Sequence, residues 1–185
     1  MTVKLSQAKD LLKAQKSLLL APNGHAVQWQ AGADRSGKTS ICKFECRVRT
    51  AATLPRGLWV RMQVSQSYPS IATIQLDTDF PNVRAHLPLY RLDLQPHGSH
   101  VNRNEGPTAL AALFIDAGVS HDHSYSLYDD EPDLDLKADQ SPVAKPLVDQ
   151  SMDFEQALTY VCSTLNIDNR KDIPIVPLQG LLGVK

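Results

Sequence analysis

Short segments in which apolar and polar side chains alternate with period two constrain the fold of this chain more than any other sequence feature. This period is typical of half-buried β-strands. The connections between the segments are short and contain Pro, Gly and Ser, which favours an antiparallel meander over units with crossover helices. We expect strands at residues 26–30, 41–48, 58–64, 71–76, 87–94 and 121–128.

Two other segments have the i, i+3, i+4 spacing of amphipathic helices. The first covers about residues 4–20, and the second covers about residues 153–165, with Ser151 or Asp153 near its N-cap. The chain has 185 residues and no evident linker. We therefore predict one α+β domain over residues 1–185, in which an antiparallel sheet of five or six strands is flanked by an N-terminal and a C-terminal helix.

Two segments have no clear period. Residues 106–118 are mostly apolar and are expected to form a short helix or a packed loop. Residues 129–146 are acidic and contain proline, and we expect them to form a loop within the domain, because too little chain follows to build a second core.

The composition excludes several classes of protein. Hydrophobic residues make up 42% of the chain and charged residues 21%, so the chain can bury a core. Three cysteines are too few for a disulfide framework, and Cys42, Cys46 and Cys162 are expected in the core. There is no signal peptide, and no apolar run reaches the roughly 18 residues of a membrane helix. These features predict a cytoplasmic protein that does not contact a membrane.

Charge is distributed unevenly along the chain. Residues 1–61 hold eleven basic and three acidic residues, a formal charge of +8, whereas the remainder holds eight basic and seventeen acidic residues, a charge of −9. The surplus is either compensated within the fold or forms a basic face for phosphates. On the second interpretation, Lys38, Arg47 and Arg49 are the predicted phosphate contacts.

Residues 32–39 match the phosphate-loop pattern G-x-x-x-x-G-K-[ST] letter for letter. That motif binds phosphate only between a buried parallel strand and the N-terminus of a helix. Here the preceding segment is a weak strand, and the residues from Ser40 onward alternate like another strand. The context predicts a hairpin loop and argues against a nucleoside triphosphatase.

Histidines cluster in one part of the sequence. His86, His97, His100, His121 and His123 fall within 38 residues, while His25 stands apart. Alternate residues of a strand share a face, so His121, His123 and Tyr125 are predicted to project together, and so are Arg91 and Asp93. If these two strands are neighbours, they form one polar surface with His100 and Asn102 at its rim.

This surface has three interpretations. Paired histidines are general acids and bases near neutral pH, Arg91 can stabilise a phosphoryl group and Tyr125 can donate a hydrogen bond, which together suit metal-independent cleavage of RNA. Alternatively, the histidines and Asp93 are ligands of zinc or iron. In the third interpretation the side chains are structural or bind a partner.

The residues also resemble a known family. The order R-L-D-L at 91–94, Pro96 with H-x-N at 100–102, H-x-H-x-Y at 121–125, and a terminal helix followed by Asn-Ile and a proline is similar to small bacterial proteins known as a domain of unknown function. The resemblance covers about residues 84–182, with an insertion at 103–120. It implies that seven polar residues form a unit, namely Arg91, Asp93, His100, Asn102, His121, His123 and Tyr125. It also implies a bacterial or phage source, where small proteins of this kind are often toxins, antitoxins or defence components.

The sequence favours a metal-independent phosphodiesterase that acts on RNA, with no cofactor and no metal ligands. Its predicted catalytic residues are Arg91, Asp93, His100, Asn102, His121, His123 and Tyr125. The alternative is a non-enzymatic binding protein, such as an antitoxin, that uses the polar surface and the acidic loop to bind a protein or nucleic-acid partner. A metal-dependent hydrolase is the third hypothesis.

Overall fold

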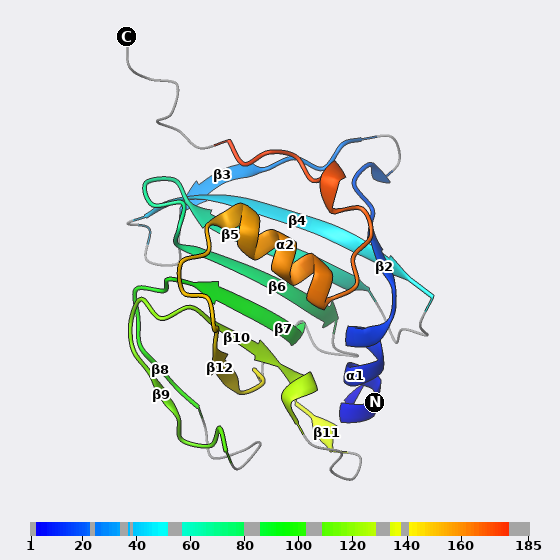
Figure 1. Cartoon of the computed structure of the whole chain (residues 1–185). Helices are drawn as coiled ribbons and strands as arrows, with labels where there is room; N and C mark the ends of the chain where they lie inside the picture. The colour runs from blue at the N-terminus through cyan, green and yellow to red at the C-terminus, as the bar shows by residue number, and fades with distance from the viewer. Residues whose placement is uncertain are drawn as a thin grey trace.

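The computed structural model describes residues 3–22, 25–33, 37, 39–51, 57–79, 86–102, 109–128, 134–137 and 141–177. Within these ranges the protein is an α+β fold with an antiparallel sheet and two α-helices, one near each end of the described chain (Figure 1). The predicted fold class is confirmed. The predicted number of strands is wrong, because the main sheet among the described residues has eight strands instead of five or six.

The eight strands pair in an antiparallel order that places the central meander between shorter edge strands. Across the sheet they are β12 (Ala144–Pro146), β10 (His121–Ser124), β7 (His86–Leu94), β6 (Ala72–Asp79), β5 (Leu58–Ser65), β4 (Ser40–Thr50) and β2 (Lys16–Leu18), with β3 (Gln30–Ala33) also paired to β4.

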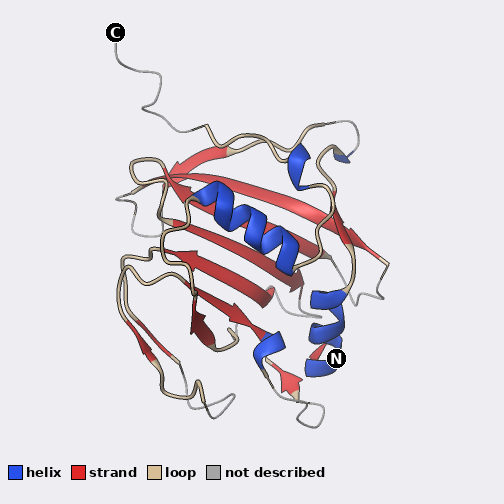
Figure 2. Ribbon diagram, viewed as in Figure 1, coloured by secondary structure: helices blue, strands red, loops and turns tan. Residues whose placement is uncertain are grey.

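The two faces of this sheet differ in chemistry because the side chains alternate. One face carries registered rows of apolar residues such as Phe44, Met62 and Ile74, and the helix α2 (Phe154–Thr164) lies across it (Figures 1 and 2). The opposite face, called the polar face below, carries the other residues of the same strands. Its members in two adjacent rows are Glu45, Arg61, Gln75, Arg91 and His123, and Lys43, Gln63, Thr73, Asp93 and His121.

The C-terminal helix agrees with the prediction, since it begins after an Asp153 N-cap whose side chain accepts a hydrogen bond from the amide of Gln156. The N-terminal helix α1 (Leu5–Lys13) is shorter than the predicted residues 4–20. The chain leaves the helix after Lys13, and β2 pairs with β4 instead. The apolar residues around Leu18 fit both a helical period and a strand period. This segment forms a strand because it pairs with β4.

Short strand pairs occur within the two segments that have no clear period. Among the described residues 109–118, β9 (Phe114–Ile115) pairs with β8 (His100–Val101) and the rest forms turns and loop, so of the two predicted alternatives the packed loop is closer to what is seen there. Within residues 129–146, β12 joins the main sheet and β11 (Asp135–Leu136) pairs with β1 (Val3–Lys4). Tertiary pairing orders parts of this segment despite its polar sequence.

The phosphate-loop lookalike connects two antiparallel strands, because Ala33 of β3 is registered with Ser40 of β4. The predicted hairpin is therefore confirmed. Lys38, one of the predicted phosphate contacts, lies outside the described residues. Cys42, Cys46 and Cys162 are buried and free, as expected. Across the described ranges, no helix is both long and apolar enough to cross a bilayer.

Candidate metal centre

Strands β7 and β10 bring the central residues of the site together. His121 is registered opposite Asp93, and His123 is registered opposite Arg91. The alternation predicted from the sequence therefore places all four side chains on the polar face. His121 and His123 are buried.

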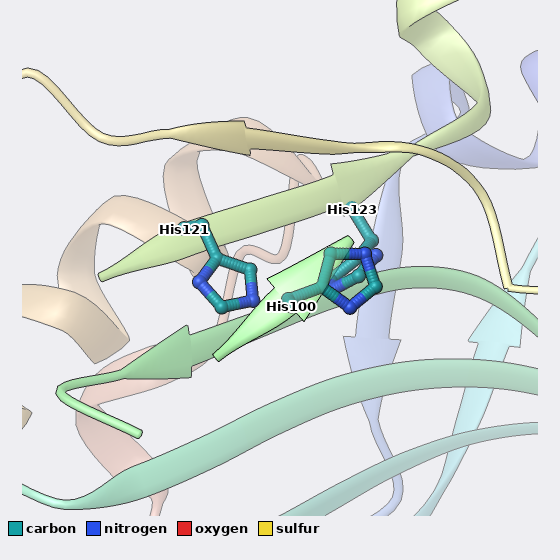
Figure 3. Close-up of side chains that lie close together, drawn as sticks. All are labelled: His100, His121 and His123. Atoms are coloured by element: carbon teal, nitrogen blue, oxygen red, sulfur yellow. The ribbon is translucent and has the colours of Figure 1, made fainter. Parts of the chain in front are cut away.

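A third imidazole reaches the site from the β8–β9 hairpin. The ring centroid of His100 lies 5.5 Å from that of His121 and 4.8 Å from that of His123, and the three rings gather at one point (Figure 3). One ligand nitrogen of each ring lies within 4.8 Å of the others. His100 is half-buried, whereas His121 and His123 are only 2% and 3% exposed.

Backbone carbonyls fix the tautomers of the two buried rings. Nδ1 of His121 lies 2.8 Å from the carbonyl oxygen of Val119, and Nδ1 of His123 lies 2.8 Å from that of Pro142. A carbonyl oxygen only accepts hydrogen bonds, so each Nδ1 carries a hydrogen and donates it. The Nε2 atoms are left with lone pairs when the rings are neutral.

Asn102 fixes the tautomer of His100 in the same way. Its Nδ2 donates to the carbonyl oxygens of Leu110 (2.9 Å) and Ala144 (2.8 Å), while its Oδ1 accepts from the amide of Ala144 (2.7 Å). The Asn102 Oδ1 atom therefore accepts from Nε2 of His100, at 3.1 Å. Nδ1 of His100 keeps the lone pair.

Asp93 completes the cluster with one free oxygen. Its Oδ1 accepts from the hydroxyl of Thr73 (2.8 Å) and from Nε of Arg91 (2.9 Å). Its Oδ2 lies 3.6 Å from Nε2 of both His121 and His123. These two distances are too long for strong hydrogen bonds.

Burial and charge set the protonation of the cluster. Burial lowers the pKa of both His100 and His121, and this favours their neutral forms. Burial by itself raises the pKa of Asp93, but interactions with His123 and Arg91 outweigh it and lower that pKa to about 2. The site at neutral pH thus combines the imidazole lone pairs of His100 and His121 with an ionised carboxylate.

The spacing of these atoms matches a metal-ligand set. Zinc-type ions bind nitrogen and oxygen ligands at about 2.0–2.2 Å, which places neighbouring ligands of a tetrahedron roughly 3.3–3.6 Å apart. The two distances of 3.6 Å from Asp93 fall on that edge length. Metal-binding histidines usually donate the N–H of their other ring nitrogen to a carbonyl or carboxylate oxygen, as these rings do. The histidine nitrogens lie up to 4.8 Å apart, so an ion bound to all three would need shorter separations.

Other predicted site residues lie elsewhere. Tyr125 falls in the 3₁₀ helix η2 (Tyr125–Leu127), where its side chain is buried beside Tyr128, so the prediction that it projects with the histidines is wrong. The hydroxyl of Ser124 accepts from the amide of Ser126, and this turn ends β10 at Ser124, four residues before the predicted end. Arg47 and Arg49 are exposed on the polar face along β4, and the histidines lie four strands away on β10.

Sequence analysis missed three supports of the site. Thr73 holds Asp93, and the carbonyl groups of Val119 and Pro142 hold the histidines. The place of Thr73 follows from alternation on the neighbouring strand, once the register is known. Backbone carbonyls carry no residue-type signal, so no pattern in the sequence identifies them.

Searches of family models, curated proteins and solved structures found no match to this chain. The class of protein therefore rests on the fold and on this centre: an α+β protein with a three-histidine, one-carboxylate cluster on the open face of its sheet.

Proposed function

We propose that the protein is a metal-dependent phosphodiesterase that acts on RNA. In this proposal His100, His121, His123 and Asp93 hold a divalent transition-metal ion. The observation that carries it is the gathering of the three imidazoles, two of which place Nε2 3.6 Å from one Asp93 oxygen, with a nitrogen of each ring anchored on an oxygen acceptor. This departs from the metal-independent mechanism favoured by the sequence.

The geometry supports the metal for a specific reason. Metal-independent cleavage needs one histidine to give a proton to the leaving group. The hydrogens fixed on His121 and His123 point to Val119 and Pro142, away from the space between the rings. A ring that acts as the acid would need a second proton, on Nε2. When the rings are neutral, the atoms that face this space are acceptors, and a cluster of acceptors binds a cation.

A bound ion would supply Lewis-acid polarisation of a phosphoryl oxygen and would make water a stronger nucleophile. In the reaction, the oxygen of water forms a bond to phosphorus as the bond from phosphorus to the leaving ribose oxygen breaks. One proton of water passes to that oxygen, so the products are a phosphomonoester and a hydroxyl. Arg91, whose side chain is 40% exposed, is placed to neutralise charge on the phosphate, and Asp93 keeps the guanidinium in position.

The proposal is tested by metal analysis and by hydrolysis in parallel. Purified protein is expected to retain about one zinc, iron or manganese ion per chain. It is expected to cleave labelled RNA and bis(p-nitrophenyl) phosphate, to lose this activity in EDTA and to regain it with added metal. His123→Ala should abolish both metal retention and cleavage.

His25→Ala is the matched control, because His25 is exposed and lies outside the cluster. It should keep both the metal and the activity. Cleavage that resists EDTA and is lost in His123→Ala would overturn the metal and restore acid–base chemistry. No cleavage by metal-loaded protein, together with a stably co-purified macromolecule, would overturn the enzyme in favour of the binding protein.

A further inference from the structure

A groove on the polar face adjoins the metal centre. It has a volume of about 470 Å³ and shares Arg91 with the centre. Its other polar lining comes mainly from the neighbouring strands β5 and β6, and includes Arg61, Gln63, Gln75, His86 and Ser141. The register runs from Arg61 through Gln75 and Arg91 to His123, so this row crosses the sheet from the groove to the centre.

Charges in the groove are layered. Arg61 pairs with Asp77, and Arg91 pairs with Asp93. The arginine side chains are 22% and 40% exposed, whereas the aspartate side chains are 1% and 7% exposed. The carboxylates of Asp77 and Asp93 therefore lie beneath the two guanidinium groups, while the carboxylate of Glu45, whose side chain is 54% exposed, pairs with Arg61 from the solvent side.

An aromatic platform extends this row on β4 and β5. The guanidinium of Arg47 lies over the ring of Trp59 at 5.1 Å from its centroid, and that of Arg61 lies over the same ring at 5.7 Å. Nε1 of Trp59 lies 3.3 Å from Oδ2 of Asp79, which holds the indole in place. Aromatic rings beside arginines are typical of surfaces that bind single-stranded nucleic acid, where bases stack and phosphates pair with the cations.

We propose that a single-stranded RNA segment lies across the polar face, from Arg47 and Trp59 through Arg61 and Arg91 to the histidine centre. Three strand spacings separate Arg47 on β4 from Arg91 on β7, or roughly 14 Å. One phosphate group does not span this distance, so neighbouring nucleotides of one chain occupy the face. This inference describes the substrate of the proposed function. It rests on the proposed function for the position of the cleaved bond, whereas RNA binding does not depend on cleavage.

Binding is measured by fluorescence anisotropy with a fluorescein-labelled single-stranded ten-nucleotide RNA, in EDTA so that metal-dependent cleavage is blocked. Arg47→Gln should weaken binding by at least about fivefold and lower the salt dependence by about one phosphate contact. Arg61→Gln should do the same, but it leaves buried Asp77 without its cation, so its fold is checked by circular dichroism. Arg47 is exposed and makes its stacking contact at the surface, which keeps the test independent of folding.

Lys171→Ala is the matched control, since it removes one exposed positive charge from the 3₁₀ helix η3 (Arg170–Asp172), outside the polar face. It should leave RNA affinity unchanged. Equal affinity of wild type and Arg47→Gln, equal weakening by Arg47→Gln and Lys171→Ala, or tighter binding of a duplex of the same length would each overturn the inference. Retained metal-dependent hydrolysis of bis(p-nitrophenyl) phosphate with no RNA binding would overturn this inference and the RNA substrate, and would leave the metal-dependent phosphodiesterase standing. RNA binding without any hydrolysis would overturn the proposed catalysis alone.

Discussion

Asn102 connects the third histidine to the rest of the fold. Its amide group forms a two-way bridge to the backbone of Ala144 on β12, and its oxygen also accepts from His100. The residue is 3% exposed, so water does not replace these partners. One side chain thus fixes both the position of the β8–β9 hairpin and the tautomer of a proposed ligand.

Asn102→Ala should therefore reduce stability and metal affinity together. We expect a loss of about 2 kcal/mol in the free energy of unfolding, because the buried backbone groups of Ala144 lose their partners. Metal affinity should fall roughly 10- to 100-fold, as is usual when an outer partner of a ligand is removed. Urea unfolding and competition with a chromogenic chelator measure the two effects.

Ser99→Ala is the control for this change, because Ser99 is exposed in the adjoining loop. It should change neither quantity. An Asn102→Ala protein with wild-type metal affinity would contradict the role assigned to His100.

Among the secondary-structure elements, both helices end at one buried cation. Nζ of Lys16 donates to the carbonyl oxygens of Leu12 (2.9 Å) and Ala14 (2.6 Å) at the end of α1, and to that of Leu165 (2.8 Å) at the end of α2. Carbonyl groups at helix C-termini lack partners within the helix and carry partial negative charge. Lys16, which is 1% exposed, satisfies both ends at once.

Lys16→Met should lower the free energy of unfolding by about 2–4 kcal/mol, because three carbonyl oxygens lose a charged donor in a buried position. Equilibrium unfolding in urea measures the loss. Lys13→Met is the control, since Lys13 is exposed at the end of α1. A loss of the same size in the control would contradict the joint cap.

The contribution of Lys16 to stability should also depend on pH. Burial lowers its pKa from 10.5 to about 8, so between these values the unfolded chain binds more protons than the folded chain. The free energy of unfolding then rises with pH across this window. Below about pH 8 both states hold the proton, so the difference in bound protons vanishes. The gap in unfolding free energy between wild type and Lys16→Met should widen by about 1–2 kcal/mol from pH 7.5 to pH 9.5. A constant or narrowing gap would contradict the lowered pKa.

The sequence predicted elements well where local period and final pairing agree. Alternation in β7 and β10 placed Asp93 and His121 on one face, and the meander topology made their strands neighbours. The sequence also placed His100 and Asn102 at the rim of this surface, but it did not show which distant contacts hold them there or where the first helix ends. The contact of His100 with these residues depends on the bridge from Asn102 to Ala144, 42 positions away in the chain. The end of α1 depends on Lys16, which contacts Leu165 at a separation of 149 positions.

In the molecule as a whole, the two faces of the main sheet hold different features. The face under α2 holds the apolar core, and the polar face holds the histidine cluster and the groove. The rings of the cluster come from the main sheet and from a separate hairpin, so an ion bound among them would cross-link two parts of the fold.

Zinc added to the metal-free protein should therefore raise its stability. At a free concentration 100 times the dissociation constant, the gain in unfolding free energy is about 2.7 kcal/mol. Magnesium at the same concentration should have little effect, because it prefers oxygen ligands and keeps its waters. Thermal unfolding of wild type and His121→Ala measures both, and equal stabilisation of the two proteins by zinc would place the ion elsewhere.

Side chains alternate along β7 from Tyr90 to Leu94, beyond a shift in its register with β6, and this limits how the length of that part of the strand can vary. Deletion of one residue before Arg91 would turn Leu92 toward the histidines and Asp93 into the core under α2, which exchanges the two environments in a single event. Deletion of two residues restores the original orientation. During divergence, insertions and deletions inside this strand should therefore survive in even numbers, whereas the hairpin and the loops can accept any length.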